Sequence, residues 1–190
     1  AVAWSLAAQR PDLMHKFVII NSPHAIPFAH ALAHDAAQIE ASLYMNWLRR
    51  PGAESVLAED NFARLLTMLD SMSDDEREAY RSCWRHGLTG GCNYYRASPL
   101  HPDTEDEPGH AAAVAAALRP EQFRVTVPTQ IIWGTGDTAL RPILLDGIER
   151  HVPNLRLHYV EGASHWVARE RADEVNGVLR TFLGNTAKSY

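Results

Sequence analysis

Cysteine is scarce in this sequence, which has only Cys83 and Cys92 among 190 residues. Two cysteines without CxxC spacing cannot build a disulfide framework, and a chance pairing between them is the minor alternative to two free thiols. The cysteine content therefore favours a reducing compartment, and we expect a cytoplasmic protein.

Long apolar runs and an excess of one charge are absent as well. No run approaches the roughly 20 residues that span a bilayer, and the N-terminus lacks the charged and apolar regions of a signal peptide. Eighteen basic and twenty-three acidic residues give a net charge of −5, with no basic block. These absences argue against nucleic-acid and membrane partners, and they leave a small molecule as the expected partner.

Three short apolar runs predict the strands of a sheet. Each is rich in β-branched or aromatic residues, as is typical of buried strands. They are FVIIN at 17–21, TQIIWG at 129–134 and RLHYV at 156–160. Because helical patterns alternate with these runs, the sheet should be parallel and the fold class α/β.

The helical patterns beside the strands begin at the first residue. The segment 1–12 has Val2 and Leu6 in i,i+4 register and no N-cap residue before it, which suggests that the chain begins within a longer pattern. Pro142 predicts the start of a second helix with Ile143, Leu144 and Ile148 facing inward. The last helix should end at Gly184 and bury Val175, Val178, Leu179, Phe182 and Leu183.

Between the first and second strands the sequence shows helical patterns only. Ser73 and Glu76 form a capping box, so a helix should start there and bury Tyr80, Cys83 and Trp84. Two further apolar stripes are Ile39, Leu43, Trp47 and Leu48, ended by Pro51-Gly52, and Phe62, Leu65, Leu66 and Leu69. We therefore expect an α/β core at 1–24, a helical cap or lid at 25–127, and the rest of the core at 128–190.

Two polar residues follow the last two strands. Asp137 comes directly after TQIIWG, in a loop that contains glycine, and His165 follows RLHYV in the segment EGASHW. Ligands bind beyond the carboxyl ends of parallel strands, so an acid there can orient a histidine that removes a proton from water or a nucleophile. Taken alone, Asp137 could equally be an Asx-turn residue that shapes its loop.

The segments WGTGDTAL and GASHW resemble the acid and histidine segments of the α/β-hydrolase family. The helical block from NSPH onward, with GLTGGCNYYRAS at 87–98, resembles the lid of its epoxide-hydrolase branch. That resemblance implies that Tyr95 is a catalytic tyrosine and that Tyr44, in YMNWLRRPG, is the second one. Without the resemblance, packing would be the better explanation for both rings.

A tyrosine suits epoxide opening because its phenol can donate a hydrogen bond to the ring oxygen and supply a proton as an alkoxide forms. Trp166, next to His165, is a candidate for the substrate pocket, whereas Tyr94 is a packing residue and His24 has no assigned role. The resemblance implies a small apolar epoxide as substrate and requires no cofactor or metal.

The nucleophile of the family is missing from this sequence. It is an aspartate on a sharp strand-to-helix turn, in a segment that resembles GHDWGG, and this chain starts at the helix that would follow. The resemblance therefore implies the C-terminal part of an α/β-hydrolase, whose parent hydrolyses an epoxide to a vicinal diol through an ester on that aspartate.

Two alternatives to an epoxide hydrolase remain open. A haloalkane or haloacetate dehalogenase shares the acid and histidine but needs donors for a halide. A non-catalytic remnant would instead complete itself with a partner. In either case FVIIN would form an unpaired apolar edge, so the isolated chain should need the missing half-sheet, form a homodimer, or aggregate.

Overall fold

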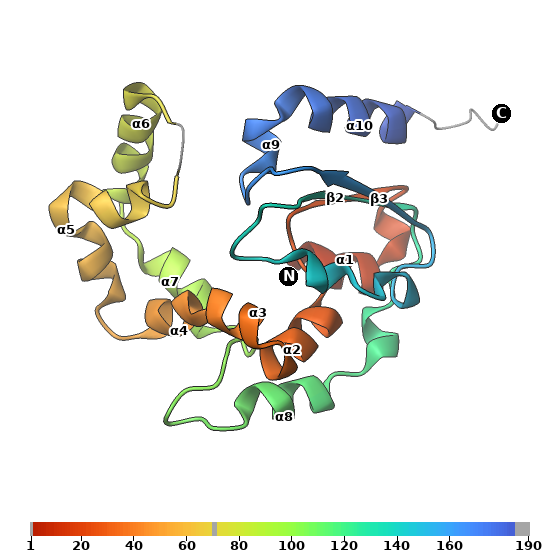
Figure 1. Ribbon diagram of the computed structural model, residues 1–190, viewed down its shortest axis with the longest axis horizontal. Helices are drawn as coiled ribbons and strands as arrows, with labels where there is room; N and C mark the ends of the chain where they lie inside the picture. Colours follow the sequence, from red (N-terminus) through yellow and green to blue (C-terminus); the bar gives the residue numbers. More distant parts are fainter. Residues whose placement is uncertain (1, 70–71, 185–190) are drawn as a thin grey trace.

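The computed structural model of the chain describes residues 2–69 and 72–184, and it contains a three-stranded parallel sheet at its centre (Figure 1). The strands are β1 (Phe17–Ile20), β2 (Thr129–Gly134) and β3 (Leu155–Val160), in the order β1-β2-β3. The register pairs Ile19 with Ile131 and Ile131 with Leu157. The three predicted strands and their parallel arrangement are confirmed.

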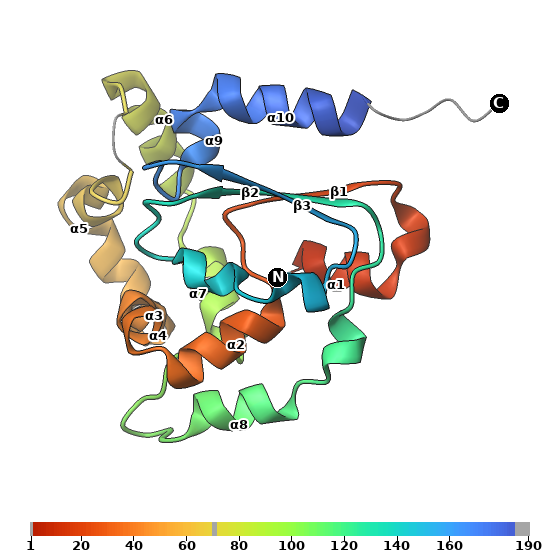
Figure 2. The ribbon, with the colours of Figure 1, turned by 45° about the vertical axis from the view of Figure 1, so that its right-hand side comes forward.

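Helices cover both faces of the sheet (Figure 2). Alternate residues of β2 point to opposite faces, so Ile131 packs with α1 (Val2–Gln9) and α2 (Ala25–His34), whereas Ile132 packs with α10 (Ala172–Gly184). All six residues of β2 are buried, as expected for a central strand. In contrast, β3 exposes Leu157 and Tyr159, so the prediction of three similarly buried strands is wrong for the outer one.

In the described part of the chain between β1 and β2, the regular elements are helical. They are α2, α3 (Ala36–Ala41), α4 (Leu43–Arg49), α5 (Ala53–Leu66), α6 (Asp74–Trp84), α7 (Thr89–Arg96), α8 (His110–Ala117) and the 3-10 helix η2 (Pro120–Phe123). The helices α5 and α6 lie to the left of the sheet in both views, and α2 and α8 pack together beneath it (Figures 1 and 2). None of the described helices has the length and apolar character that a membrane crossing requires.

The stripe predicted for residues 39–48 is divided between two helices. Asp35 caps the first of them, because its Oδ1 accepts the Gln38 backbone N–H at 2.6 Å, and Ser42 separates α3 from α4. Leu48 is buried as predicted, whereas Leu43 at the start of the second helix is exposed and Met45 is buried in its place. The prediction of a single continuous stripe was therefore wrong at Leu43.

Other helix predictions are confirmed in part. The capping box of Ser73 and Glu76 is present at the start of α6, but Tyr80 and Cys83 are exposed because no described element covers that face. The predicted Phe62–Leu69 helix is interrupted: residues 59–62 are non-helical inside α5, and Leu69 lies beyond its end.

After β2, the predicted helix at Pro142 is replaced by two 3-10 turns, η3 (Pro142–Leu145) and η4 (Ile148–Arg150). Gly147 lies between them with φ of +72°, a left-handed conformation that ends the first turn. Leu144 and Ile148 are buried as predicted, whereas Ile143 is exposed. The last helix ends at Gly184 as predicted, although Leu183 at its end is exposed.

Candidate active site

Asp137 and His165 meet at the carboxyl ends of β2 and β3. The Oδ2 atom of Asp137 lies 2.7 Å from Nδ1 of His165. Because an ionised carboxylate can only accept, Nδ1 carries the proton, and in the neutral ring the lone pair is on Nε2. The Asp137 side chain is fully buried, while 38% of the His165 side chain is exposed. The pair therefore has one end fixed in the core and one end open to a substrate or water.

Asp137 also shapes its own loop. Its Oδ1 accepts the backbone N–H groups of Ala139 at 2.9 Å and Leu140 at 2.8 Å. The Asx-turn and the orientation of His165 thus use different oxygens of one carboxylate, so the two interpretations of Asp137 are compatible. The turn fixes the direction in which Oδ2 points toward the imidazole.

Asn21 is a third residue of this site, which sequence reasoning missed. It follows β1 directly, with φ of +40°, and is buried. Its Oδ1 accepts the Gly134 N–H at 2.8 Å, and its Nδ2 donates to Asp137 Oδ2 at 2.9 Å and to the Ser164 carbonyl at 3.0 Å. One side chain therefore joins the ends of all three strands. The available signal was an asparagine directly after a buried strand, since asparagine tolerates left-handed backbone.

The histidine loop lies close against β2. A Cβ at Gly134 would overlap the Ala163 carbonyl, and one at Gly136 would lie 2.9 Å from the Gly162 carbonyl oxygen. On the other side of the loop, Glu170 accepts the Ser164 backbone N–H at 2.8 Å and also the Ser164 hydroxyl. These hydrogen bonds hold the pKa of Glu170 below its usual range. Glycine in β2 and an ionised glutamate after β3 thus fix the segment that carries His165.

Tyr44 and Tyr95 are in contact within the helical part of the molecule. They come from α4 and α7, and their ring centroids are 5.9 Å apart in an edge-to-face arrangement. Burial raises the pKa of both phenols, and the neighbouring Tyr95 raises that of Tyr44 further. Both therefore stay protonated at neutral pH and can act as hydrogen-bond donors.

The two tyrosines and His165 line one cavity of about 390 Å³. That volume is within the range of small-molecule sites, and the wall is mainly apolar. The remaining lining residues are Asn21, Ser22, Pro23, Ala25, Phe28, Met45, Tyr94, Ser98, Leu100 and Leu140. The structure thus brings together three of the four residues predicted as catalytic in one cavity, with Asp137 directly behind His165.

Trp166 does not line this cavity. Its indole N–H donates to the Met68 carbonyl at 2.8 Å, and its ring contacts His165 edge to face with centroids 5.2 Å apart. The hydrogen bond to Met68 holds the ring at the exposed side of His165. The structure places Trp166 beside the histidine and outside the pocket for which it was a candidate.

His24 is buried and caps α2. Its Nδ1 accepts the Ile26 N–H at 3.3 Å and its Nε2–H donates to the Phe123 carbonyl at 2.8 Å. Burial lowers the pKa of His24 to about 4, despite the hydrogen bond to Phe123. The ring is therefore neutral at physiological pH and links α2 to the segment before β2.

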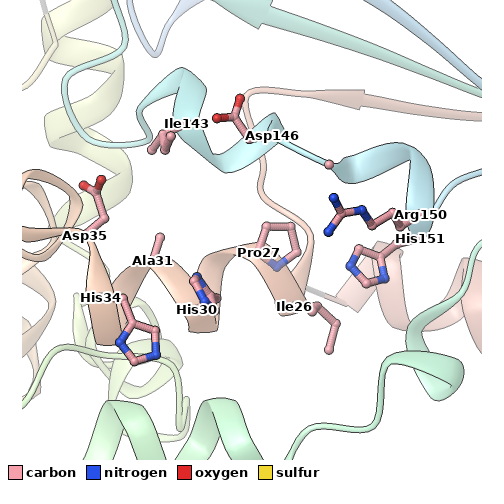
Figure 3. A pocket seen from close by; sticks show the side chains of 11 residues that line it. Ile26, Pro27, His30, Ala31, His34, Asp35, Ile143, Asp146, Arg150 and His151 are labelled. Atoms are coloured by element: carbon pink, nitrogen blue, oxygen red, sulfur yellow. The ribbon is translucent and has the colours of Figure 1, made fainter.

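A second cavity of about 560 Å³ lies between α2 and the segment from Ile143 to His151 (Figure 3). His30 and His34 come from α2, while Asp146 and Arg150 come from the opposite segment. This cavity is larger than the first, but none of the four predicted catalytic residues lines it. We therefore assign the candidate active site to the smaller cavity.

An acid and a histidine that meet at the carboxyl ends of successive parallel strands are the arrangement of an α/β-hydrolase. No family model matches the sequence. Among individual proteins, the chain is 28% identical to the AB hydrolase superfamily protein YfhM of Bacillus subtilis, over 97% of this chain and 63% of that protein. It is 24% identical to human epoxide hydrolase 4, over 96% of this chain and 50% of that protein.

Solved structures that are similar to this chain include epoxide hydrolases as well. The chain superposes on an epoxide hydrolase from Bacillus megaterium with a TM-score of 0.84 and 29% identity, over 97% of this chain and 66% of that one. For an epoxide hydrolase from hot-environment metagenomes, the TM-score is 0.81 and the identity 31%, over 96% of this chain and 64% of that one. The chain belongs to the α/β-hydrolase superfamily and is epoxide-hydrolase-like. It spans about half to two thirds of the length of these relatives.

Proposed function

We propose that this chain supplies the base, its orienting acid and the two phenols of an epoxide hydrolase whose aspartate nucleophile lies on a segment outside these 190 residues. The observation that carries the proposal is the cavity that Tyr44, Tyr95 and His165 line together, because it combines two protonated donors with a histidine. The expected substrate is a small, mainly apolar epoxide that fits a cavity of about 390 Å³.

In the first step, the carboxylate of the nucleophile attacks one epoxide carbon and the carbon–oxygen bond of the ring breaks. Tyr44 and Tyr95 donate hydrogen bonds to the departing oxygen, and one of them gives it a proton. The product of this step is a hydroxyalkyl ester on the enzyme. The raised pKa values of both phenols keep the proton on them until negative charge develops on the ring oxygen.

In the second step, His165 removes a proton from water through Nε2, and the hydroxide attacks the ester carbonyl. The ester carbon–oxygen bond then breaks, and the departing alkoxide takes the proton from His165 and leaves as the vicinal diol, with one oxygen from the epoxide and one from the nucleophile. The carboxyl group keeps the oxygen of the water, and its proton returns to the phenolate, so the carboxylate and the phenol are both restored. Asp137 stabilises the imidazolium that forms because it accepts the Nδ1–H at 2.7 Å. The proposal needs neither a metal nor an organic cofactor.

The proposal also gives the free edge of β1 a partner. Among the described residues, β1 pairs with β2 alone. We propose that additional strands, on a segment upstream of this chain, pair with the free edge of β1. By full-length protein we mean this chain together with those upstream strands. A homodimer through the same edge is the alternative arrangement for the chain on its own.

The test is diol formation by the full-length protein. Replacing Tyr95 by phenylalanine removes one donor and keeps the ring, so turnover should fall by roughly a hundredfold to a thousandfold, the range for one lost transition-state donor. Tyr80→Phe, at an exposed tyrosine of α6 that does not line the catalytic cavity, is the matched control and should change turnover little. Full diol formation by Tyr95→Phe together with faster halide release from a haloalkane would instead favour a dehalogenase.

A further inference from the structure

A cluster of two histidines and a glutamate lies on the loop that connects α7 to α8. Ligand atoms from His101, Glu107 and His110 all lie within 4.8 Å of one another. His101 is 1% exposed, whereas Glu107 is exposed and His110 is half-buried. A buried histidine beside an exposed carboxylate has no role in the chemistry described above, because none of these three residues lines the catalytic cavity.

Each imidazole already has one nitrogen occupied by a backbone carbonyl. Nδ1 of His101 donates to the Pro102 carbonyl at 2.9 Å, and Nε2 of His110 donates to the Pro99 carbonyl at 2.8 Å. In the neutral rings the lone pairs are therefore on Nε2 of His101 and Nδ1 of His110. This is the arrangement found around metal-binding histidines, in which the outer nitrogen donates to a carbonyl and fixes the ring.

The inward nitrogen of His101 has no hydrogen-bond partner within residues 2–69 and 72–184. This Nε2 atom lies 3.9 Å from Oε2 of Glu107, which is beyond hydrogen-bonding distance, and the same carboxylate oxygen lies 3.4 Å from the guanidinium of Arg49. The two rings are stacked with centroids 4.0 Å apart. One ligand atom from each of the three side chains thus lies within 4.8 Å of the other two, while the stacked rings are not yet aimed at a common point and Glu107 is paired with Arg49.

We propose that His101, Glu107 and His110 form a zinc site. Two neutral imidazoles and one carboxylate are a common ligand set for Zn²⁺, with water completing a tetrahedral shell. Zinc–ligand bonds of about 2.0–2.1 Å require ligand atoms roughly 3.3 Å apart. The ligand atoms must therefore close in by up to about 1.5 Å. Glu107 must turn from Arg49 toward the metal, and the His110 ring must tilt out of the stack while His101 stays fixed in the core.

Hydrogen bonds of Asp103 and Asn46 fix the backbone of the segment that carries these three residues. Asp103 accepts the backbone N–H groups of Gly109 at 2.7 Å and Ala111 at 2.8 Å, which brings the two ends of the loop together. Asn46 of α4 donates to the carbonyls of Pro102 and Asp103, both at 3.1 Å. A zinc ion here would close the loop from His101 to His110 and fasten it beside α4, which also carries Tyr44.

The chain contains an internal control for adventitious zinc binding. His30 and His34 lie at i,i+4 on the exposed side of α2, with ring centroids 4.6 Å apart, and form a generic chelating pair without a carboxylate between them. Removing one of these histidines should not affect a site built on the loop.

The experiment is titration of the metal-stripped full-length protein with Zn²⁺ alone in a calorimeter. We expect one zinc per chain, with affinity reduced at least tenfold by His110→Gln and by Glu107→Gln and unchanged by His30→Gln. Melting in the presence of zinc is the second measurement: the midpoint should rise for the parent and for His30→Gln but not for Glu107→Gln. Glu107 is exposed, so its replacement leaves the core intact.

Three results would overturn the proposal: no stoichiometric zinc, equal affinity in Glu107→Gln and the parent, or loss of binding only in His30→Gln. Cobalt gives an additional readout, because a Co²⁺ substitute in a tetrahedral site has strong visible absorption that His110→Gln should abolish. None of these measurements uses epoxide turnover, so the zinc site and the proposed function succeed or fail independently.

Discussion

Acidification should destabilise the fold through His24. Burial lowers the pKa of this ring to about 4 in the folded protein, whereas an unfolded histidine titrates near its ordinary value of about 6.5. Between these two values the unfolded chain binds one more proton at His24 than the folded chain does, so stability falls as the pH falls. The slope is about 1.4 kcal/mol per pH unit, and the full difference is roughly 3 kcal/mol.

The structure gives the reason for this loss. Protonation at Nδ1 would break the hydrogen bond from the Ile26 N–H and place a positive charge against His151, whose ring stacks on His24 at 5.0 Å. Burial lowers the pKa of His151 as well, so both rings are neutral above pH 6.5. The contribution of His24 is present in full above that pH and is lost as the pH falls toward 4.

The assay is urea unfolding of the full-length protein at a series of pH values from 7 to about 4, compared with His24→Asn. Asparagine can still accept at the start of α2, but it does not titrate. The free energies of unfolding of the two proteins should converge as the pH falls, by roughly 3 kcal/mol in total. Parallel curves over this range would refute the assignment of a neutral, buried His24.

Two further perturbations test the frame around the catalytic pair. Asn21→Gly keeps the left-handed backbone but removes the donor to Asp137 and leaves the Gly134 N–H unpaired. The free energy of unfolding in urea should therefore fall by about 2–4 kcal/mol, and turnover should fall as well. An unchanged rate of diol formation would exclude a positioning role for Asn21. Gly134→Ala should lower the free energy of unfolding by at least about 2 kcal/mol, because the new Cβ meets the Ala163 carbonyl. The control is Gly177→Ala in α10, whose Cβ meets nothing within 4 Å. This variant should be neutral or more stable by up to about 1 kcal/mol. Equal melting temperatures for the two alanine variants would contradict the close approach.

The strands and the acid–base pair could be predicted from the sequence because both depend on local order. A strand followed by a short loop places the polar residue of that loop at the carboxyl end of the sheet, and this happens twice, at Asp137 after β2 and at His165 after β3. The pairing of the two strands then brings the side chains to 2.7 Å. The roles of Tyr44 and Tyr95 came from resemblance, since an apolar helix stripe alone indicates packing.

What could not be predicted depends on tertiary contacts. The helix break at Ser42 leaves Leu43 exposed, and the exposed face of α6 reflects the lack of a described element against it. Asn21 was missed because its importance lies in partners 113 and 116 residues away along the chain. The position of Trp166 depends on a carbonyl at Met68, 98 residues away, which no local pattern indicates.

The most direct test of the proposed function is intact-protein mass spectrometry of His165→Gln in the full-length protein after incubation with an epoxide. If His165 activates water only in the second step, the variant should still open the epoxide and accumulate the ester, and its mass should increase by one substrate. Asp137→Asn should show the same adduct with slower hydrolysis, and the parent protein should show none. Multiple-turnover diol formation by His165→Gln without any adduct would contradict the account.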